Sequence, residues 1–215
     1  MEKKKVFLVG DSITGGYKRY VAESLKDSCE VYSAPDNCRF TQYCLRYLDV
    51  WKKKLELGDD VDLVHWNVGL WDTLELYEDG CMTPPDIYAH YIDRICKRIR
   101  LLFPKATVIF ATSTPILEHR FLKPKISIRR NSTVREYNAI ATEICKKHGF
   151  LIDDLYSAVE NIPEEYYSDM THLNTPEGAQ LTTNTVTKSI CEALDLEYKE
   201  FTLKDYEEVK NVEGF

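Results

Sequence analysis

The stretch Val6-Phe7-Leu8-Val9-Gly10-Asp11-Ser12 joins four apolar residues to a glycine, a carboxylate and a hydroxyl. An unbroken apolar run that ends in a turn pattern is typical of a strand buried on both faces of a parallel sheet. Residues that follow such a strand leave the sheet at its carboxyl end, where open α/β folds bind their ligands. The stretch therefore predicts a parallel sheet with Ser12 exposed at its ligand-binding edge.

Outward from this run, further apolar strands alternate with segments of helical periodicity. The strands are predicted over residues 30–33, 61–66, 106–111 and 150–152. Helices are predicted over residues 17–26, 40–55 and 87–102, then after a capping-box pattern at Thr133 and Glu136, and after Thr175-Pro176. Strands that alternate with helices of this length indicate βαβ units, and hence a five-stranded, mostly parallel sheet between two layers of helices.

Length, composition and charge limit the class of protein. With 215 residues, of which 44% are hydrophobic, the chain is long enough for one full core. We expect one domain over residues 1–195 and a charged, aromatic tail over residues 196–215. The formal net charge of −7 argues against a nucleic-acid partner, because phosphate binding needs a concentrated basic face. No membrane span and no secretory signal are recognised, since the apolar run behind Lys3-Lys4-Lys5 is too short, so we expect a cytoplasmic protein.

The cysteines and acidic pairs do not indicate a cofactor or metal. The seven cysteines form no Cys-x-x-Cys pair and no group with histidine, so neither a zinc site nor a redox pair is predicted. Cys96, Cys145 and Cys191 lie among apolar neighbours in helical segments and are interpreted as core residues. Asp153-Asp154 is interpreted as a helix cap rather than a divalent-metal site.

A second stretch, Asp169-Met170-Thr171-His172, places a carboxylate three residues before an imidazole. At this spacing the carboxylate is able to orient the ring, and a neutral imidazole near pH 7 suits the removal of a proton from a serine hydroxyl. The segment follows the fifth predicted strand, so it reaches the same edge of the sheet as Ser12. Together the two stretches predict a Ser12–His172–Asp169 catalytic triad.

The two stretches, in this order and within residues 5–195, resemble the GDSL-type esterases of the SGNH hydrolase superfamily. Gly10-Asp11-Ser12 matches the block of the family's nucleophile, and Asp169-Met170-Thr171-His172 matches its final block. The resemblance implies a flavodoxin-like three-layer α/β/α fold. It also implies that Ser12 is the nucleophile, that His172 is the general base and that Asp169 orients it.

The third block of the chain, Asn67-Val68-Gly69-Leu70-Trp71-Asp72, departs from the family's Gly-x-Asn-Asp pattern. Gly69 and Asp72 match, whereas Trp71 holds the position of the asparagine that donates to the oxyanion. Either the Asn67 side chain or the Trp71 indole N–H supplies that donor, beside the backbone N–H of Ser12. The place of Asn67 at a strand end favours Asn67, and an Asn67 that only ties two loops together is the structural alternative.

The second block, Ala34-Pro35-Asp36-Asn37-Cys38-Arg39, lacks the glycine whose backbone N–H usually completes the oxyanion hole. Any residue except proline has this N–H, and we expect Cys38 or a neighbour in the loop of residues 37–39 to supply it. Arg39 either faces the substrate, where a guanidinium favours an anionic or hydroxylated ligand, or forms a surface ion pair. Asp11, Gly69 and Trp71 are also expected to border the substrate, although the favoured role of Asp11 is to cap the following helix.

These patterns predict a serine ester hydrolase that acts through a covalent acyl-enzyme. Aromatic side chains near the strand ends suit sugar rings, and they are Trp66, Trp71, Tyr77, Tyr166 and Tyr167. No large apolar lid is recognised, which favours small acyl esters, and O-acetylated carbohydrates first, over lipid surfaces. An acyltransferase with the same triad stays open because only the acceptor differs, and the irregular oxyanion blocks leave open a carbohydrate-binding protein that has lost catalysis.

Overall fold

The computed structural model describes residues 2–121 and 126–210, and its centre is a five-stranded sheet. The strands are β1 (Lys4–Val9), β2 (Cys29–Ser33), β3 (Leu63–Trp66), β4 (Thr107–Ala111) and β5 (Leu151–Asp153). They pair in the order β2-β1-β3-β4-β5, and every pair is parallel. All five predicted strands are confirmed, and the strand order is that of flavodoxin-like folds.

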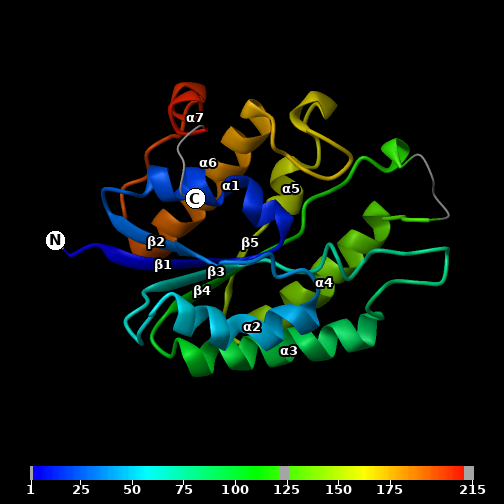
Figure 1. Ribbon diagram of the computed structural model, residues 1–215, viewed down its shortest axis with the longest axis horizontal. Coiled ribbons are helices and arrows are strands. Elements are labelled where there is room, and N and C mark those ends of the chain that lie inside the picture. The colour runs from blue at the N-terminus through cyan, green and yellow to red at the C-terminus, as the bar shows by residue number, and fades with distance from the viewer. Residues whose placement is uncertain (1, 122–125, 211–215) are drawn as a thin grey trace.

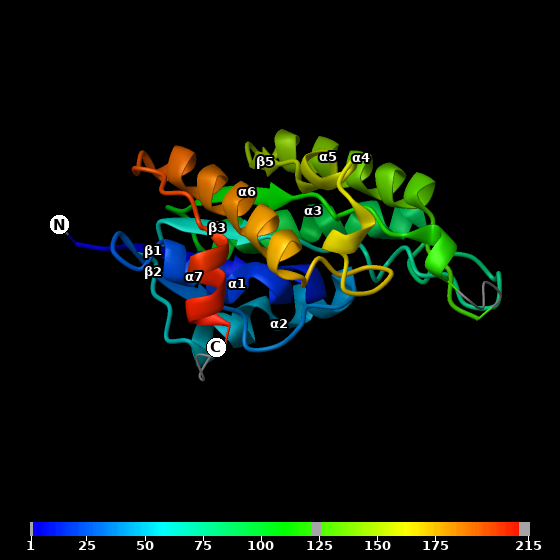
Figure 2. The ribbon, with the colours of Figure 1, turned by 90° about the horizontal axis from the view of Figure 1, so that it is seen from above.

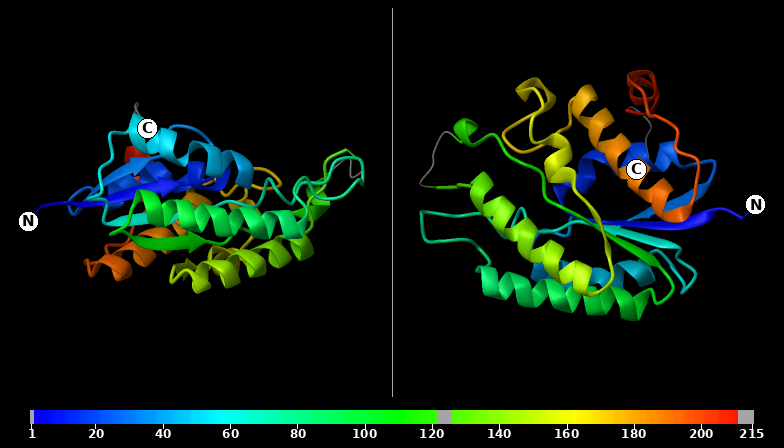
Figure 3. Two further views of the ribbon diagram at one scale, coloured as in Figure 1. Left: turned by 90° about the horizontal axis from the view of Figure 1, so that it is seen from below. Right: turned by 180° about the vertical axis from the view of Figure 1, so that it is seen from behind.

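Helices cover both faces of the sheet (Figures 1 and 3). Helices α2 (Thr41–Lys54), α3 (Pro85–Leu102) and α4 (Asn131–Lys147) pack on one face. Helices α1 (Ser12–Ser24), α5 (Leu155–Val159) and α6 (Pro176–Leu194) pack on the other. Side chains alternate along β1, so that Phe7 and Val9 join the first core while Val6 and Leu8 join the second. The three-layer fold is confirmed, and none of the described helices is long and apolar enough to cross a membrane.

Helix α1 begins at Ser12, five residues before the predicted start at residue 17. Its first turn is capped by Asp11, whose carboxylate accepts the Ile13 N–H at 2.9 Å. The predicted cap is therefore confirmed, and it starts the helix earlier than the sequence pattern indicated. Because the cap directly follows β1, Ser12 stands in the first turn of the helix, at the end of the strand.

Helix α4 begins at Asn131, and the capping box predicted at Thr133 and Glu136 is wrong. The Asn131 side chain instead exchanges two hydrogen bonds with the backbone of Ile116, at 2.9 and 2.8 Å. This tertiary contact anchors the helix start to the segment after β4, and it places Thr133 inside the first turn. The start predicted at Thr175-Pro176 is confirmed, since Thr175 caps α6 and Pro176 is its first residue.

The tail after α6 folds back onto the core (Figure 2). It forms a short helix, α7 (Leu203–Val209), whose capping box is made by Thr202 and Asp205. The Tyr20 ring of α1 contacts the rings of Phe201 and Tyr206, with centroids 5.5 and 5.0 Å away. Within the described residues the tail is thus packed on α1 and α6 through aromatic contacts.

The three cysteines predicted to be core residues are confirmed as such. Cys96, Cys145 and Cys191 are buried, and all seven cysteines are free thiols. Cys96 Sγ and Cys145 Sγ lie 3.7 Å apart where α3 packs against α4. The thiols therefore fill space between helices and the sheet.

The carboxyl edge of the sheet carries the longer connections. β1 and β3 leave the sheet side by side, because Val9 lies opposite Trp66, and the strand order reverses direction at this point. Residues 67–84 and the segment that contains the short helix η1 (Glu118–Arg120) extend beyond this edge (Figure 1). Isolated bridge pairing of Glu75 with Ile128 joins the two segments. A further short helix, η2 (Glu164–Tyr166), leads into the turn before α6.

Candidate active site

Ser12, His172 and Asp169 form a continuous hydrogen-bonded chain at the carboxyl edge. Ser12 Oγ lies 2.8 Å from His172 Nε2, and His172 Nδ1 lies 2.7 Å from Asp169 Oδ2. The carboxylate accepts a hydrogen bond from Nδ1–H, and this assigned tautomer leaves Nε2 as the acceptor for the serine hydroxyl. The turn between η2 and α6 thus brings the imidazole to the first turn of α1, across 160 residues of sequence.

The Asp169 carboxylate is held in its ionised form. Its partial burial alone would raise the pKa, but hydrogen bonds from the His172 ring and from the backbone N–H groups of His172 and Thr171 outweigh this effect. The net result is an Asp169 pKa below its ordinary value. At neutral pH the carboxylate is therefore charged and able to stabilise a positive imidazole.

Asp11 is a second carboxylate beside the nucleophile, and it is buried. Its Oδ1 accepts the Ile13 N–H, while Oδ2 has no hydrogen-bond partner among the described residues. Burial raises the pKa of Asp11 to about 6, against the opposing effects of the Ile13 N–H and of the nearby Arg129 and His172 charges. Asp11 thus adds a titratable charge directly next to Ser12.

A hollow of about 200 Å³ opens beside Ser12, between the first turns of α1 and the loop after β2. The polar side chains of its lining are Asp11, Ser12, Thr14, Lys18, Ser33, Asp36 and Asn37. Pockets for drug-sized ligands usually span roughly 300–1,000 Å³. The hollow at the nucleophile therefore suits a small group.

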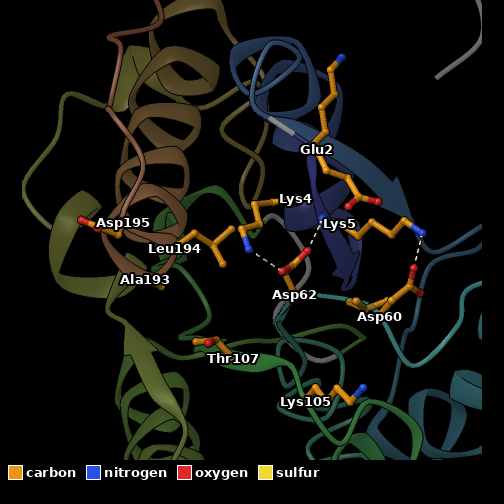
Figure 4. A pocket seen from close by; sticks show the side chains of 12 residues that line it. Glu2, Lys4, Lys5, Asp60, Asp62, Lys105, Thr107, Ala193, Leu194 and Asp195 are labelled. Atoms are coloured by element: carbon orange, nitrogen blue, oxygen red, sulfur yellow. Dashed lines mark hydrogen bonds and ion pairs between the residues drawn. The ribbon is translucent and has the colours of Figure 1, made fainter.

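A larger hollow, of about 620 Å³, lies at the opposite, amino edge of the sheet. Figure 4 shows the lysine and aspartate side chains that line it. Lys4 pairs with Asp62 at 2.9 Å, and Lys5 pairs with Asp60. Two of the lysines that line this hollow are thus paired with aspartates, and none of the triad residues lies in its lining.

Residues 8–181 match the model of the GDSL-like lipase/acylhydrolase family. The chain belongs to this family. It is therefore a hydrolase, and the block that contains Ser12 and the block that contains His172 both lie inside the matched region. A comparison with curated proteins gave no match.

Solved structures share the fold of this GDSL-like hydrolase. A lipase/acylhydrolase from Enterococcus faecalis is 21% identical with a TM-score of 0.70, over 92% of this chain and 100% of that chain. The acetyl xylan esterase AlAXEase is 18% identical with a TM-score of 0.67, over 86% of this chain and 99% of that chain. A GDSL-like lipase from Bacteroides thetaiotaomicron is 19% identical with a TM-score of 0.67, over 88% and 89% of the two chains. At these identities the similarity establishes the fold alone.

Two of the oxyanion donors predicted for this GDSL-like hydrolase form hydrogen bonds elsewhere, Cys38 with its single N–H and Asn67 with one of its two amide N–H groups. The backbone N–H of Cys38 donates to the Gly10 carbonyl at 3.0 Å. The Asn67 side chain is fully buried, and its Nδ2 donates to the Ala111 carbonyl at 3.0 Å. Asn67 therefore ties the end of β3 to the end of β4, which matches the structural alternative. The Ser12 N–H, in the first turn of α1, has no partner within the helix.

In the third block, the Trp71 indole N–H is a side-chain donor without a hydrogen-bond partner among the described residues. Its ring is partly exposed and packs edge-on against Phe40, with centroids 5.5 Å apart, and its indole N–H has no partner among the described residues. The neighbouring Asp72 is buried and accepts the Thr41 N–H at 3.1 Å and the Thr41 hydroxyl at 2.7 Å. Asp72 thus caps α2 from outside the helix and holds the loop that carries Trp71.

Gly69 has a conformational role in this loop. Its φ of +143° lies outside the range that side chains favour. A Cβ atom there would come within 2.8 Å of the Tyr88 hydroxyl, which itself donates to the Val68 carbonyl. Gly69 is buried, so it has no exposed surface for a substrate to contact.

Arg39 lies at the surface rather than over the triad. Its guanidinium is 3.8 Å from Asp36 Oδ1 and 4.8 Å from the centre of the Tyr43 ring. The ion-pair alternative for Arg39 is therefore the one that the geometry matches. Its φ of +48° turns the loop after β2 toward α2.

The acidic pair after β5 has two separate roles. Asp154 accepts the Ser157 N–H at 3.2 Å and caps α5, as predicted. Asp153 instead lies 3.0 Å from His65 Nε2 in the core, a buried contact that the sequence pattern did not indicate. No group of metal-binding side chains is found in the described part of the chain.

Arg129 lies near the site although no sequence pattern indicated it. It is partly buried, its Nε donates to the Leu70 carbonyl at 2.7 Å, and its charge lowers the pKa of Asp11. No local pattern distinguishes it from the adjacent Arg130, whose guanidinium is paired with Glu75 at 2.8 Å. Only the pairing of residues 75 and 128 places Arg129 over the loop that follows β3.

The raised pKa of Asp11 predicts a change of stability with pH. Because the folded state binds this proton more tightly than the unfolded state, the contribution of Asp11 to the free energy of unfolding falls as pH rises from about 4 to about 6. We expect Asp11→Asn, measured relative to the wild type by urea unfolding, to gain about 2–2.5 kcal/mol between pH 4 and pH 7.5. The exposed Asp27→Asn is the control, and equal pH dependence of both variants would contradict the burial of a charge at Asp11.

Proposed function

We propose that the protein is a serine esterase that forms a covalent acyl-enzyme on Ser12. Ser12 Oγ attacks the ester carbonyl while His172 Nε2 takes its proton, and the bond to the alcohol oxygen then breaks as His172 returns the proton to it. Water repeats the sequence and releases the acid. Asp169 holds the imidazole through Nδ1 throughout. The observation that carries the proposal is the unbroken Ser12–His172–Asp169 chain of 2.8 and 2.7 Å contacts.

The oxyanion of the tetrahedral intermediate takes two donors in this proposal. One is the backbone N–H of Ser12, at the positive end of the α1 dipole. The other is the indole N–H of Trp71, which holds the sequence position of the family's asparagine. Support comes from the commitment of Asn67 and Cys38 to Ala111 and Gly10.

The proposed substrate is a short acyl ester of a carbohydrate, with acetyl as the acyl group. The small polar hollow at Ser12 supports a short acyl group. A second hollow, of about 450 Å³, is lined by the aromatic rings of Phe40, Tyr43 and Tyr47. Phe40 contacts Trp71, so this aromatic surface continues toward the third block, and aromatic rings suit the faces of sugars. An acetyl xylan esterase among the proteins of the same fold is consistent with this choice.

The test is covalent labelling of Ser12 by a small organophosphonate, followed by intact mass measurement. We expect one label on the wild type and none on Ser12→Ala, since only an activated serine attacks phosphorus. Ser113→Ala is the matched control, because this buried serine lies outside the triad, and it should keep the label. Labelling that persists in Ser12→Ala contradicts the proposed nucleophile.

Release of acetate from acetylated xylan then tests the substrate class. An acyltransferase would be recognised by faster loss of 4-nitrophenyl acetate when a carbohydrate acceptor is added, together with an acetylated acceptor. A protein that takes the phosphonate but hydrolyses acetylated xylan no faster than buffer would contradict the carbohydrate part of the proposal alone. Absence of both label and hydrolysis would contradict the esterase.

A further inference from the structure

Arg129 is held in place beside the loop that follows β3. Residues 75 and 128 exchange two backbone hydrogen bonds, each of 2.9 Å, which hold the segment before α4 against residues 67–84. From this segment the Arg129 Nε reaches the carbonyl of Leu70, at 2.7 Å. Leu70 directly precedes Trp71, so the guanidinium lies against the third block of the site.

The two terminal nitrogens of the guanidinium have no hydrogen-bond partner among the described residues. No carboxylate lies within 4.0 Å of Arg129 among the described residues, and the only hydrogen bond found there is the one from Nε. Arg130, one residue later, has its carboxylate partner in Glu75. With Nε committed to Leu70, the two terminal nitrogens of Arg129 keep the paired N–H groups that match a carboxylate or phosphate.

The position of Arg129 is also electrostatically unusual. Partial burial lowers its pKa, and the charge of Asp11 opposes this effect without forming an ion pair within 4.0 Å. An arginine stays protonated at neutral pH in spite of such a shift. A partly desolvated positive charge therefore persists next to the turn that carries Ser12, and a ligand anion would compensate it.

We infer that Arg129 binds a carboxylate or phosphate group on the alcohol part of the ester that Ser12 cleaves. The inference rests on the proposed function, since it names a feature of the same substrate. The acetyl group of the proposed substrate has no charge, so the anion belongs to the alcohol. The expected substrate is thus the acetyl ester of a carbohydrate, or of a related alcohol, that carries a carboxylate or phosphate group.

The experiment compares three acetyl esters: phenyl acetate, 4-acetoxybenzoate and 4-acetoxyphenyl phosphate. Each kcat/KM is divided by the rate of alkaline hydrolysis of the same ester, which removes the difference between the leaving groups. A charge-assisted pair is worth about 1.5–3 kcal/mol, so we expect the wild type to prefer an anionic ester by about ten- to one-hundredfold. The two anionic esters distinguish carboxylate from phosphate as the favoured group.

Arg129→Gln should abolish this preference, mainly through a higher KM for the anionic ester, and Arg129→Lys should restore part of it. Arg130→Gln is the matched control, because it removes an adjacent but ion-paired guanidinium, and it should keep the wild-type ratio. A wild type without preference, or an Arg129→Gln variant with the wild-type ratio, overturns the inference. A structural arginine would instead lower the melting temperature and leave the ratio unchanged.

A binding measurement separates this inference from the proposed reaction. Ser12→Ala protein is titrated with 4-hydroxybenzoate and with phenol, and the shift in melting temperature is recorded. We expect stabilisation by 4-hydroxybenzoate that is lost in the Ser12→Ala, Arg129→Gln double variant. Such binding without esterase activity in the wild type would contradict the proposed function and support the anion site. Esterase activity without anion binding would support the proposed function and contradict the anion site.

Discussion

His172→Ala is expected to lower kcat for a short acetyl ester by about 10³-fold or more. The variant loses the group that accepts the Ser12 proton and returns it to the leaving alcohol. Nothing else within the described residues is hydrogen-bonded to Ser12 Oγ, so no neighbouring base takes over this role. Asp169→Asn should cost the same or less, because it affects the orientation and charge of the ring rather than the ring itself. The measurement is steady-state hydrolysis of 4-nitrophenyl acetate.

The chain offers a matched control for this substitution. His148 Nε2 lies 2.8 Å from Asp93 Oδ1 in another His–Asp pair, where the end of α4 meets α3. His148→Ala removes the same side chain and the same kind of contact away from the triad, so it should keep kcat and alter only stability. Full activity in His172→Ala with native circular dichroism would contradict the triad.

The parts of the structure that were predictable from sequence are those with local signals. The strand β1 was recognisable because four apolar residues precede Gly10, and the start of α6 because Thr175 and Pro176 are adjacent. The contact of Asp169 with His172 was predictable because the two residues are three positions apart within one turn. Their contact with Ser12 followed from the parallel sheet, since every strand ends at the same edge.

The remaining features depend on groups that are distant in sequence. The Cys38 N–H was expected to face the oxyanion, but it donates to the Gly10 carbonyl instead. The Asn67 amide likewise meets Ala111 of a neighbouring strand. Arg129 gains its place only through the pairing of residues 75 and 128, which no periodicity indicates. In each case a polar group forms its hydrogen bond with a residue that is distant in sequence, so no local pattern identifies the partner.

Trp71→Phe is expected to lower kcat by about 10²–10³-fold with little change in KM, the usual cost of one oxyanion donor. Phenylalanine keeps the ring that packs against Phe40 but has no N–H, so the change isolates the hydrogen bond. Trp66→Phe is the matched control. It makes the same replacement at a buried indole whose N–H has no partner, and it should keep the activity of the folded protein.

Asn67→Ala makes this test two-sided, because it removes the other donor that the sequence offers. Its Nδ2 bond to Ala111 is buried, so its loss should reduce the free energy of unfolding by about 1–3 kcal/mol. The kcat of the folded variant should stay within about tenfold of the wild type, since the amide faces the strand end rather than the ester. A large loss of kcat in Asn67→Ala without a lower melting temperature, together with near-normal Trp71→Phe, would return the role to the asparagine. In that case the second Nδ2 N–H, which has no hydrogen-bond partner among the described residues, would be the donor, while the first N–H stays on the Ala111 carbonyl.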